Sequence, residues 1–129
     1  MDPDKNLEEY KKELTPLAYQ VTRLGGTEPP FSGEFYNNKS TGLYLCVCCG
    51  VKLFSSNDKY DSGTGWPSFK QTLVHENIKE IQDLSHNMVR IEVKCSSCDA
   101  HLGHLFHDGP PPSGKRYCIN SVSLSFKEE

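Results

Sequence analysis

Two C-x-x-C pairs constrain the fold of this chain more than any other feature of its sequence. Cys46 and Cys49 form the first pair, in the stretch CVCCG, and Cys95 and Cys98 form the second, in CSSC. A tight turn within each pair directs both sulfur atoms toward one point, and two such turns supply the four thiolates of a tetrahedral Zn²⁺ site. Gly50, directly after Cys49, gives the first turn the backbone freedom that it needs. The pattern predicts one structural zinc ion that joins two distant segments.

Other uses of these cysteines remain open from the sequence alone. The alternatives are free buried thiols or a redox-active pair, although a redox pair is typical of a helix N-terminus. Cys48 lies inside the first turn, where we expect its side chain to point away from the metal. It is either an incidental, half-exposed thiol or a thiol with a redox role.

The rest of the chain has the pattern of a mainly β domain. Residues 25–42 are rich in turn-forming residues, which predicts a long loop with room for one short hairpin. Later segments alternate apolar and polar residues or are rich in β-branched residues, as strands are. These segments are 42–47, 52–54, 86–95, 101–106, 116–121 and 122–126. We therefore expect a mainly antiparallel β core.

A short helical arm precedes this predicted core. Leu7, Tyr10 and Leu14 share one face of a helix that we expect to end near Leu14. Thr15 and Pro16 then have the pattern of an N-cap followed by proline at the first helical position. The pattern predicts a second short helix directly after the first.

Length, charge and hydropathy bound the organisation and the class of protein. The chain predicts a single domain, 1–129, with a helical arm over residues 1–24 and a β core over residues 25–129. The net charge of −3 provides no basic surface of the kind that nucleic-acid binding needs. No apolar run approaches the ~18 residues of a membrane helix. The first residues lack a secretory or transit signal, so we expect a cytoplasmic protein, although a trimmed organellar chain would look the same.

The sixth cysteine stands far from both pairs, in the stretch RYCIN. If this stretch is a strand, Arg116, Cys118 and Asn120 share one face, while Tyr117 and Ile119 take the other and can face the core. A nearby guanidinium favours the thiolate over the thiol, which lowers the pKa of a cysteine and makes it a better nucleophile. The alternative is an inert strand cysteine.

Histidines and a tryptophan surround this stretch in the sequence. Strict strand alternation would place His101 and His104 on opposite faces, but Gly103 allows a bend that brings both to one pocket. Histidine is the side chain best suited to move protons near neutral pH. A metal-binding role is disfavoured because four cysteines already complete a zinc site, and His107 is our candidate for a simple surface residue. Trp66, in the loop GTGWPSF, is either a plug of the core or part of a recognition surface.

Together these motifs resemble those of the methionine-(R)-sulfoxide reductases of the B type. The two C-x-x-C pairs, GTGWPSF, HLGH, DGP and RYCINS follow one another in this order, and the resemblance runs from about Leu14 to Phe126. It implies two antiparallel β-sheets with a few peripheral helices. It also implies an enzyme that repairs oxidised methionine after oxidative damage to proteins, acting on one of the two sulfoxide epimers.

The resemblance assigns a role to individual residues. Cys118 matches the catalytic cysteine of the family, and His101 and His104 match its two active-site histidines. Trp66 matches the tryptophan that packs on the substrate methyl group. The other matches are Arg116, Asn120 and Asp108 for polar residues of the pocket, and Cys46, Cys49, Cys95 and Cys98 for the zinc ligands.

One departure concerns the second cysteine of the reaction. Many members carry a resolving cysteine before GWPSF or near the N-terminus, whereas here residues 61–65 read DSGTG and no cysteine precedes Cys46. Either an external thiol, such as that of thioredoxin or glutaredoxin, reduces Cys118 directly, or Cys48 acts as its partner. We expect the external thiol, because Cys48 lies next to a ligand and its movement would strain the metal site. We expect the chain to be a monomer.

The expected reaction uses the sulfur of Cys118 as the nucleophile. Its thiolate attacks the sulfoxide sulfur, while His104 or, as the second choice, His101 protonates the oxygen. Methionine leaves, and Cys118 becomes a sulfenic acid that a thiol returns to the resting state. Two other classes remain as alternatives: a zinc-knuckle binding module without catalysis, and a cysteine hydrolase, which would need a backbone oxyanion pocket.

Overall fold

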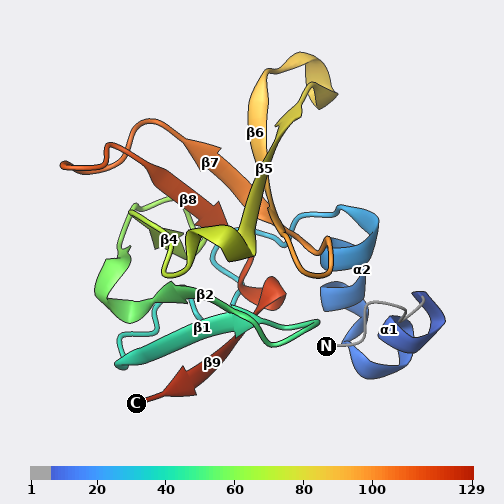
Figure 1. Ribbon diagram of the computed structural model, residues 1–129. Coiled ribbons are helices and arrows are strands. Elements are labelled where there is room, and N and C mark those ends of the chain that lie inside the picture. Colours follow the sequence, from blue (N-terminus) through green and yellow to red (C-terminus); the bar gives the residue numbers. More distant parts are fainter. Residues whose placement is uncertain (1–6) are drawn as a thin grey trace.

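Two antiparallel β-sheets form the body of the molecule, as the sequence and its resemblance predict (Figure 1). The structure, a computed structural model, describes residues 7–129. The smaller sheet has the order β2-β1-β9, with β1 at Gly42–Cys46, β2 at Lys52–Ser55 and β9 at Leu124–Glu128. The larger sheet has the order β3-β4-β8-β7-β6-β5. Its strands are β3 (Lys59–Tyr60), β4 (Ser68–Phe69), β5 (Ile78–Asp83), β6 (Arg90–Cys95), β7 (His101–Phe106) and β8 (Arg116–Ile119).

The two predicted helices are present at the start of the described chain. They are α1 at Leu7–Glu13 and α2 at Pro16–Leu24, and residues 1–6 of the predicted arm lie outside the described residues. The Thr15 side chain accepts a hydrogen bond from the Ala18 amide at 3.1 Å, which confirms the predicted N-cap. Neither helix has the length and apolar content needed to cross a membrane.

Aromatic side chains from both sheets form the core. Phe54 of β2 stacks on Phe69 of β4 with ring centroids 4.4 Å apart, and Tyr44 of β1 meets Phe69 edge-on at 5.1 Å. Tyr117 of β8 and Leu102 of β7 are also buried in this cluster. Burial of these large rings is the main contribution that holds the two sheets together.

Part of the larger sheet differs from the sequence prediction. The strand β5 was not expected, because only Ile78 of its six residues is buried and its polar residues hide any apolar alternation. The strand expected over residues 86–95 begins only at Arg90, since a short 3₁₀ turn at Ser85–Asn87 reverses the chain. The result is a β5–β6 hairpin that projects beyond the body of the molecule (Figure 1).

Candidate active site and metal site

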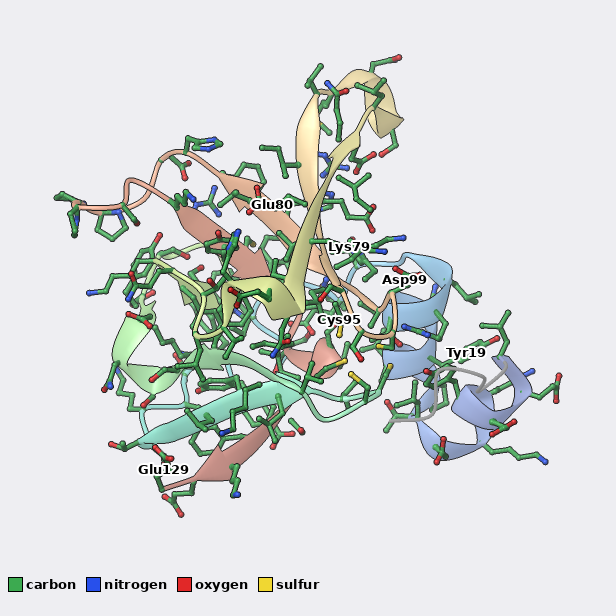
Figure 2. The ribbon with its side chains drawn as sticks, in the orientation of Figure 1. Tyr19, Lys79, Glu80, Cys95, Asp99 and Glu129 are labelled. Carbon is green, nitrogen blue, oxygen red and sulfur yellow. The ribbon has the colours of Figure 1, made fainter. Side chains whose placement is uncertain are left out.

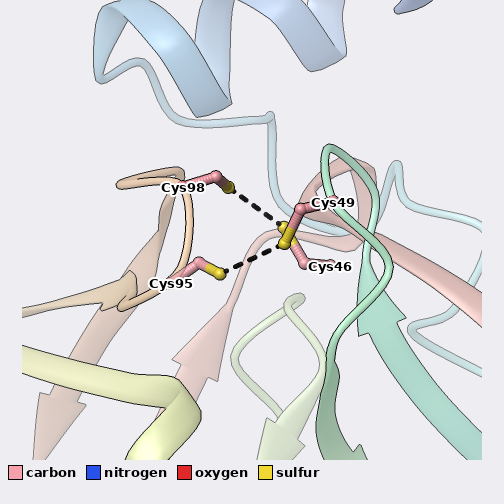
Figure 3. A group of neighbouring side chains, drawn as sticks. All are labelled: Cys46, Cys49, Cys95 and Cys98. Carbon is pink, nitrogen blue, oxygen red and sulfur yellow. Dashed lines mark hydrogen bonds between the residues drawn. The ribbon is translucent and has the colours of Figure 1, made fainter. Parts of the chain in front are cut away.

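The four cysteines of the C-x-x-C pairs lie in one cluster (Figure 3). Their sulfur atoms all lie within 4.8 Å of one another. The Cys46 and Cys98 sulfurs are 3.6 Å apart, and the Cys49 and Cys95 sulfurs are 3.5 Å apart. Tetrahedral zinc with Zn–S bonds of about 2.3 Å places neighbouring sulfurs about 3.8 Å apart. The cluster therefore has the ligands and the spacing to bind a metal ion, consistent with zinc.

The two turns that carry the cysteines have the same backbone geometry. In each turn, the first cysteine donates its amide to the carbonyl five residues later and accepts from the amide four residues later. The residue that follows the second cysteine has positive φ, 81° at Gly50 and 64° at Asp99. The sequence prediction identified the need for Gly50 but missed Asp99, a residue type that tolerates the left-handed conformation. Asp99 also pairs with Lys79 of β5, beside Cys95 (Figure 2).

The helix α2 covers one side of the cysteine cluster. Arg23 donates to the Cys98 carbonyl at 2.9 Å and lies 3.6 Å from the Cys98 sulfur. Cys48 is half-buried and interacts with Thr22 and Arg23 of the helix, and also with Cys46 and Cys98. Cys48 lies beside the cluster but does not belong to the set of four cysteines that could hold a metal ion.

Cys118 lies in the middle of the larger sheet, directly opposite His104 on β7 and Ser68 on β4. Directly opposed residues share a face and have Cβ atoms roughly 4.5–5.5 Å apart. The strands β7 and β8 approach closely at this point because β7 has a glycine: a Cβ atom on Gly103 would collide with the Cys118 carbonyl oxygen. Alternate residues of β8 are buried in the core, as predicted, and Arg116 and Cys118 are half-buried on the other face.

A small pocket opens at Cys118. Its volume is about 110 Å³, and its lining includes four of the predicted site residues, Trp66, His104, Cys118 and Asn120. The rest of the lining is Thr27, Arg90, Gly103 and Phe106. The lining does not include the other three predicted residues, His101, Arg116 and Asp108. A larger hollow of about 210 Å³, lined by residues 36–40, 56 and 59–61, contains none of the predicted site residues.

A β-bulge brings the two histidines together. The pairing of β6 with β7 shifts by one residue between His101 and Gly103, so Leu102 is the extra residue of the bulge. The extra residue reverses the strand alternation, and the rings of His101 and His104 lie with centroids 5.5 Å apart. The two rings therefore meet as expected, through the residue next to Gly103, but only His104 lines the pocket.

The two histidines have different environments. His101 is 5% exposed, and its Nδ1 atom lies 2.7 Å from a carboxylate oxygen of Glu92. Burial lowers the pKa of His101, although Glu92 opposes this shift. His104 reaches the pocket, and its Nε2 atom lies 2.9 Å from the Asp83 carboxylate. The hydrogen bond from His104 is the largest cause that holds the pKa of Asp83 well below its usual range.

Arg116 is fixed by Asp108 beside the pocket. Its Nε and Nη2 atoms donate to the two carboxylate oxygens of Asp108 at 2.8 and 3.1 Å, and its guanidinium lies 4.3 Å from the centre of the Phe106 ring. The Asp108 side chain is 63% exposed. Asp108 therefore orients Arg116 and does not face the pocket.

The electrostatics of Cys118 differ from the sequence prediction. Burial raises the pKa of the Cys118 thiol, while the charge of Arg116 and a hydrogen bond with Thr64 oppose this shift. Arg116 acts in the predicted direction, but its contribution does not overcome burial. At neutral pH the resting group is therefore mainly the thiol. Thr64 is the residue of the DSGTG loop that contacts Cys118, and the sequence prediction missed it.

Hydrogen bonds to the backbone hold Trp66 and Asn120. The indole Nε1 atom of Trp66 donates to the Glu28 carbonyl at 3.0 Å, and the half-buried ring lines the pocket instead of plugging the core. The Asn120 side chain accepts from the Glu28 amide and donates to the Leu102 carbonyl, both at 3.0 Å. Both ends of the Asn120 amide are therefore engaged by the chain itself.

Sequence reasoning missed several residues of the site. Arg90 and Glu92 lie two residues apart on one face of β6, and the sequence alternation indicated this polar face. Nothing in the sequence, however, placed the face beside the histidines. Asp83 gave no signal, because β5 was not predicted. Thr27 lies in the long loop before β1, far from Cys118 in the sequence.

Comparison with known proteins agrees with this geometry. Residues 14–128 match the SelR domain family. The chain is 57% identical over 120 residues to the peptide methionine sulfoxide reductase MsrB of Thioalkalivibrio sulfidiphilus, which covers 93% of this chain and 88% of the relative. It is also 57% identical to the MsrB proteins of Hahella chejuensis (95% and 88% covered) and Methanosarcina barkeri (98% and 89% covered). The chain therefore belongs to the SelR domain family and is an oxidoreductase of the methionine-(R)-sulfoxide reductase B type.

Proposed function

We propose that this chain reduces methionine (R)-sulfoxide, mainly in proteins, to methionine, and so repairs oxidised proteins. The observation that carries the proposal is the position of Cys118. It lines a small pocket, directly opposite His104, and Trp66 lines the same pocket. The names of the relatives support a peptide-linked substrate.

The first stage transfers oxygen from the substrate to Cys118. The Cys118 sulfur attacks the sulfoxide sulfur and forms a transient S–S bond. As the oxygen passes to the cysteine sulfur, this S–S bond and the S–O bond of the substrate both break, and an S–O bond forms on Cys118. The substrate sulfur gains two electrons and the cysteine sulfur loses two, which gives methionine and a sulfenic acid. Starting from the thiol, no outside proton is needed, because the thiol proton ends on the sulfenic oxygen.

His104 relays this proton in the proposed mechanism. Its Nε2 atom is held by Asp83, so the exchange with substrate oxygen falls to Nδ1. Arg116 favours the thiolate as the proton leaves Cys118. His101, buried against Glu92, supports the His104 ring from behind.

The walls of the pocket account for the choice of epimer. The Trp66 ring accepts the S-methyl group, and the polar side near His104 accepts the oxygen. Exchange of the two groups would press the oxygen against the indole. An unpaired polar group in a dry site costs roughly 1–3 kcal/mol.

An external thiol completes the cycle in our proposal. It condenses with the sulfenic acid to a mixed disulfide and water, and a second thiol then releases Cys118. Cys48 has Thr22 and Arg23 of α2 and the cysteine cluster as its neighbours, whereas Cys118 has Thr64 and Arg116. Cys48 is therefore poorly placed as a partner.

The cluster of Cys46, Cys49, Cys95 and Cys98 would hold one structural zinc ion, which fixes both turns and leaves no open position for catalysis.

The substitution Cys118→Ser tests the proposal, with Cys48→Ser as the matched control. We expect Cys118→Ser to lose turnover of an (R)-sulfoxide peptide completely and Cys48→Ser to retain it. Mass spectrometry after one turnover without reductant should find one added oxygen on Cys118. Wild-type turnover by Cys118→Ser would refute the mechanism, and a Cys48–Cys118 disulfide would refute the external thiol.

A further inference from the structure

Glu28 is a buried carboxylate to which the proposed mechanism gives no role. Its residue is 1% exposed, in the long loop between α2 and β1. One carboxylate oxygen, Oε1, accepts at 2.9 Å from the amide of Val122, three residues beyond the end of β8. The other, Oε2, is buried and has no hydrogen-bond partner within residues 7–129. Burial raises the pKa of Glu28, although backbone amides at Val122 and Ser121 oppose the shift.

The backbone of Glu28 holds two walls of the pocket. Its amide donates to the Asn120 side chain at 3.0 Å, and its carbonyl accepts from the Trp66 indole at 3.0 Å. The preceding residue, Thr27, itself lines the pocket. A displacement of the Glu28 main chain would therefore disturb three residues of the lining together.

The loop closes tightly over the Glu28 side chain. A Cβ atom on Gly33 would lie 2.7 Å from Glu28 Oε2 and would collide with the Ser121 side chain. The chain can double back over the carboxylate at this point only because residue 33 is glycine. The side chain is thus enclosed on one side by its own loop and bound on the other by the segment after β8.

We infer that Glu28 is a positioning residue: its side chain, anchored on the Val122 amide, fixes the indole of Trp66 and the amide of Asn120 through the Glu28 main chain. The consequence for catalysis rests on the proposed function, but the consequence for Trp66 does not. A misplaced Trp66 ring would bind the substrate methyl group poorly, and a misplacement of ~1 Å can cost about 10²-fold in rate.

The test compares Glu28→Asp with Glu28→Gln, and uses Glu34→Ala, an exposed residue of the same loop, as the control. Aspartate keeps the charge but is too short to reach the Val122 amide, whereas glutamine keeps the length and an acceptor oxygen. Trp66 is the only tryptophan, so acrylamide quenching of fluorescence reports its exposure directly. We expect Glu28→Asp to increase quenching and to lower kcat/KM by up to about 10²-fold, mainly through KM. Glu28→Gln should recover most of both, and Glu34→Ala should match the wild type.

Unchanged quenching in Glu28→Asp would overturn the inference, as would equal disturbance by Glu28→Gln and Glu28→Asp. Circular dichroism shows whether each variant is folded. If Glu28→Asp does not fold, increased quenching in Glu28→Gln would contradict the anchor and wild-type quenching would support it. A wild-type chain without reductase activity would refute the proposed function alone, because the quenching comparison still decides the role of Glu28.

Discussion

The four-cysteine cluster and the pocket at Cys118 are built in different ways. The cluster of Cys46, Cys49, Cys95 and Cys98 consists of two local turns, each complete within six residues. The pocket at Cys118 takes its lining from β6, β7, β8 and two loops, and its central pair joins residues on neighbouring strands. The cluster depends on local backbone geometry, whereas the pocket depends on strand register.

The surroundings of the sulfur atoms differ as well. In the cluster, each thiol lies close to another thiol, which suits a metal ion that replaces their protons. At Cys118 the neighbours are a guanidinium, a hydroxyl and an imidazole on the opposite strand. The same side chain therefore suits metal binding in one place and the proposed nucleophilic role in the other, because its neighbours differ.

Removal of the metal should have the largest effect on stability, because it acts on the four-cysteine cluster and not on the pocket. Structural zinc contributes on the order of 10 kcal/mol in small peptides, comparable with the whole stability of a domain. We expect a strong chelator, or Cys98→Ala, to lower the melting temperature by more than about 10 °C. Cys48→Ala, in the first turn but outside the set of four, is the control and should keep its zinc by elemental analysis. Equal melting of the metal-free and metal-loaded chains would show that the cluster has no such role.

The substitution His104→Ala should act on the pocket and not on the cluster. Loss of a group that moves a proton in the transition state typically costs about 10²–10⁴-fold, and we expect a loss of kcat/KM in that range. Zinc content should stay unchanged. His107→Ala, an exposed histidine three residues further on, is the matched control and should keep wild-type kinetics. A His104→Ala enzyme with wild-type kcat/KM would remove His104 from the mechanism.

The smallest predicted effect concerns the buried imidazole behind the pocket. Burial lowers the pKa of His101 in the folded chain, against the influence of Glu92 and together with His104 and Lys94. Below the unfolded pKa of about 6.5 the unfolded chain therefore binds a proton that the folded chain does not. The free energy of unfolding should fall as the pH drops below that value, by at most about 1.4 kcal/mol per pH unit from this group.

Denaturant unfolding at pH 7 and pH 5 checks this expectation, with His101→Gln as the comparison. Glutamine retains a donor for Glu92 but does not titrate. The variant should therefore lose less stability than the wild type between the two pH values. Parallel losses in both proteins would show that His101 does not supply the pH dependence.

The sequence was most informative where the physics is local. The spacing of the C-x-x-C pairs predicted the clustering of the four cysteines, and Thr15 with Pro16 predicted the start of α2. The alternation of RYCIN correctly separated the buried from the half-buried face of β8. Sequence patterns failed to predict β5, because its mostly exposed residues show no apolar periodicity. They therefore also failed to predict that Asp83 of β5 binds His104.

By itself, the sequence determined that this chain forms a β domain with a four-cysteine cluster and a separate cysteine between polar residues, because turns and strand alternation depend on neighbours in the chain. Only the tertiary structure decided which groups meet at Cys118. Strand register set the pairing with His104, the bulge at Leu102 brought His101 to the same face, and burial reversed the expected shift of the Cys118 pKa. Register and burial depend on how distant segments pack, and no local pattern encodes them.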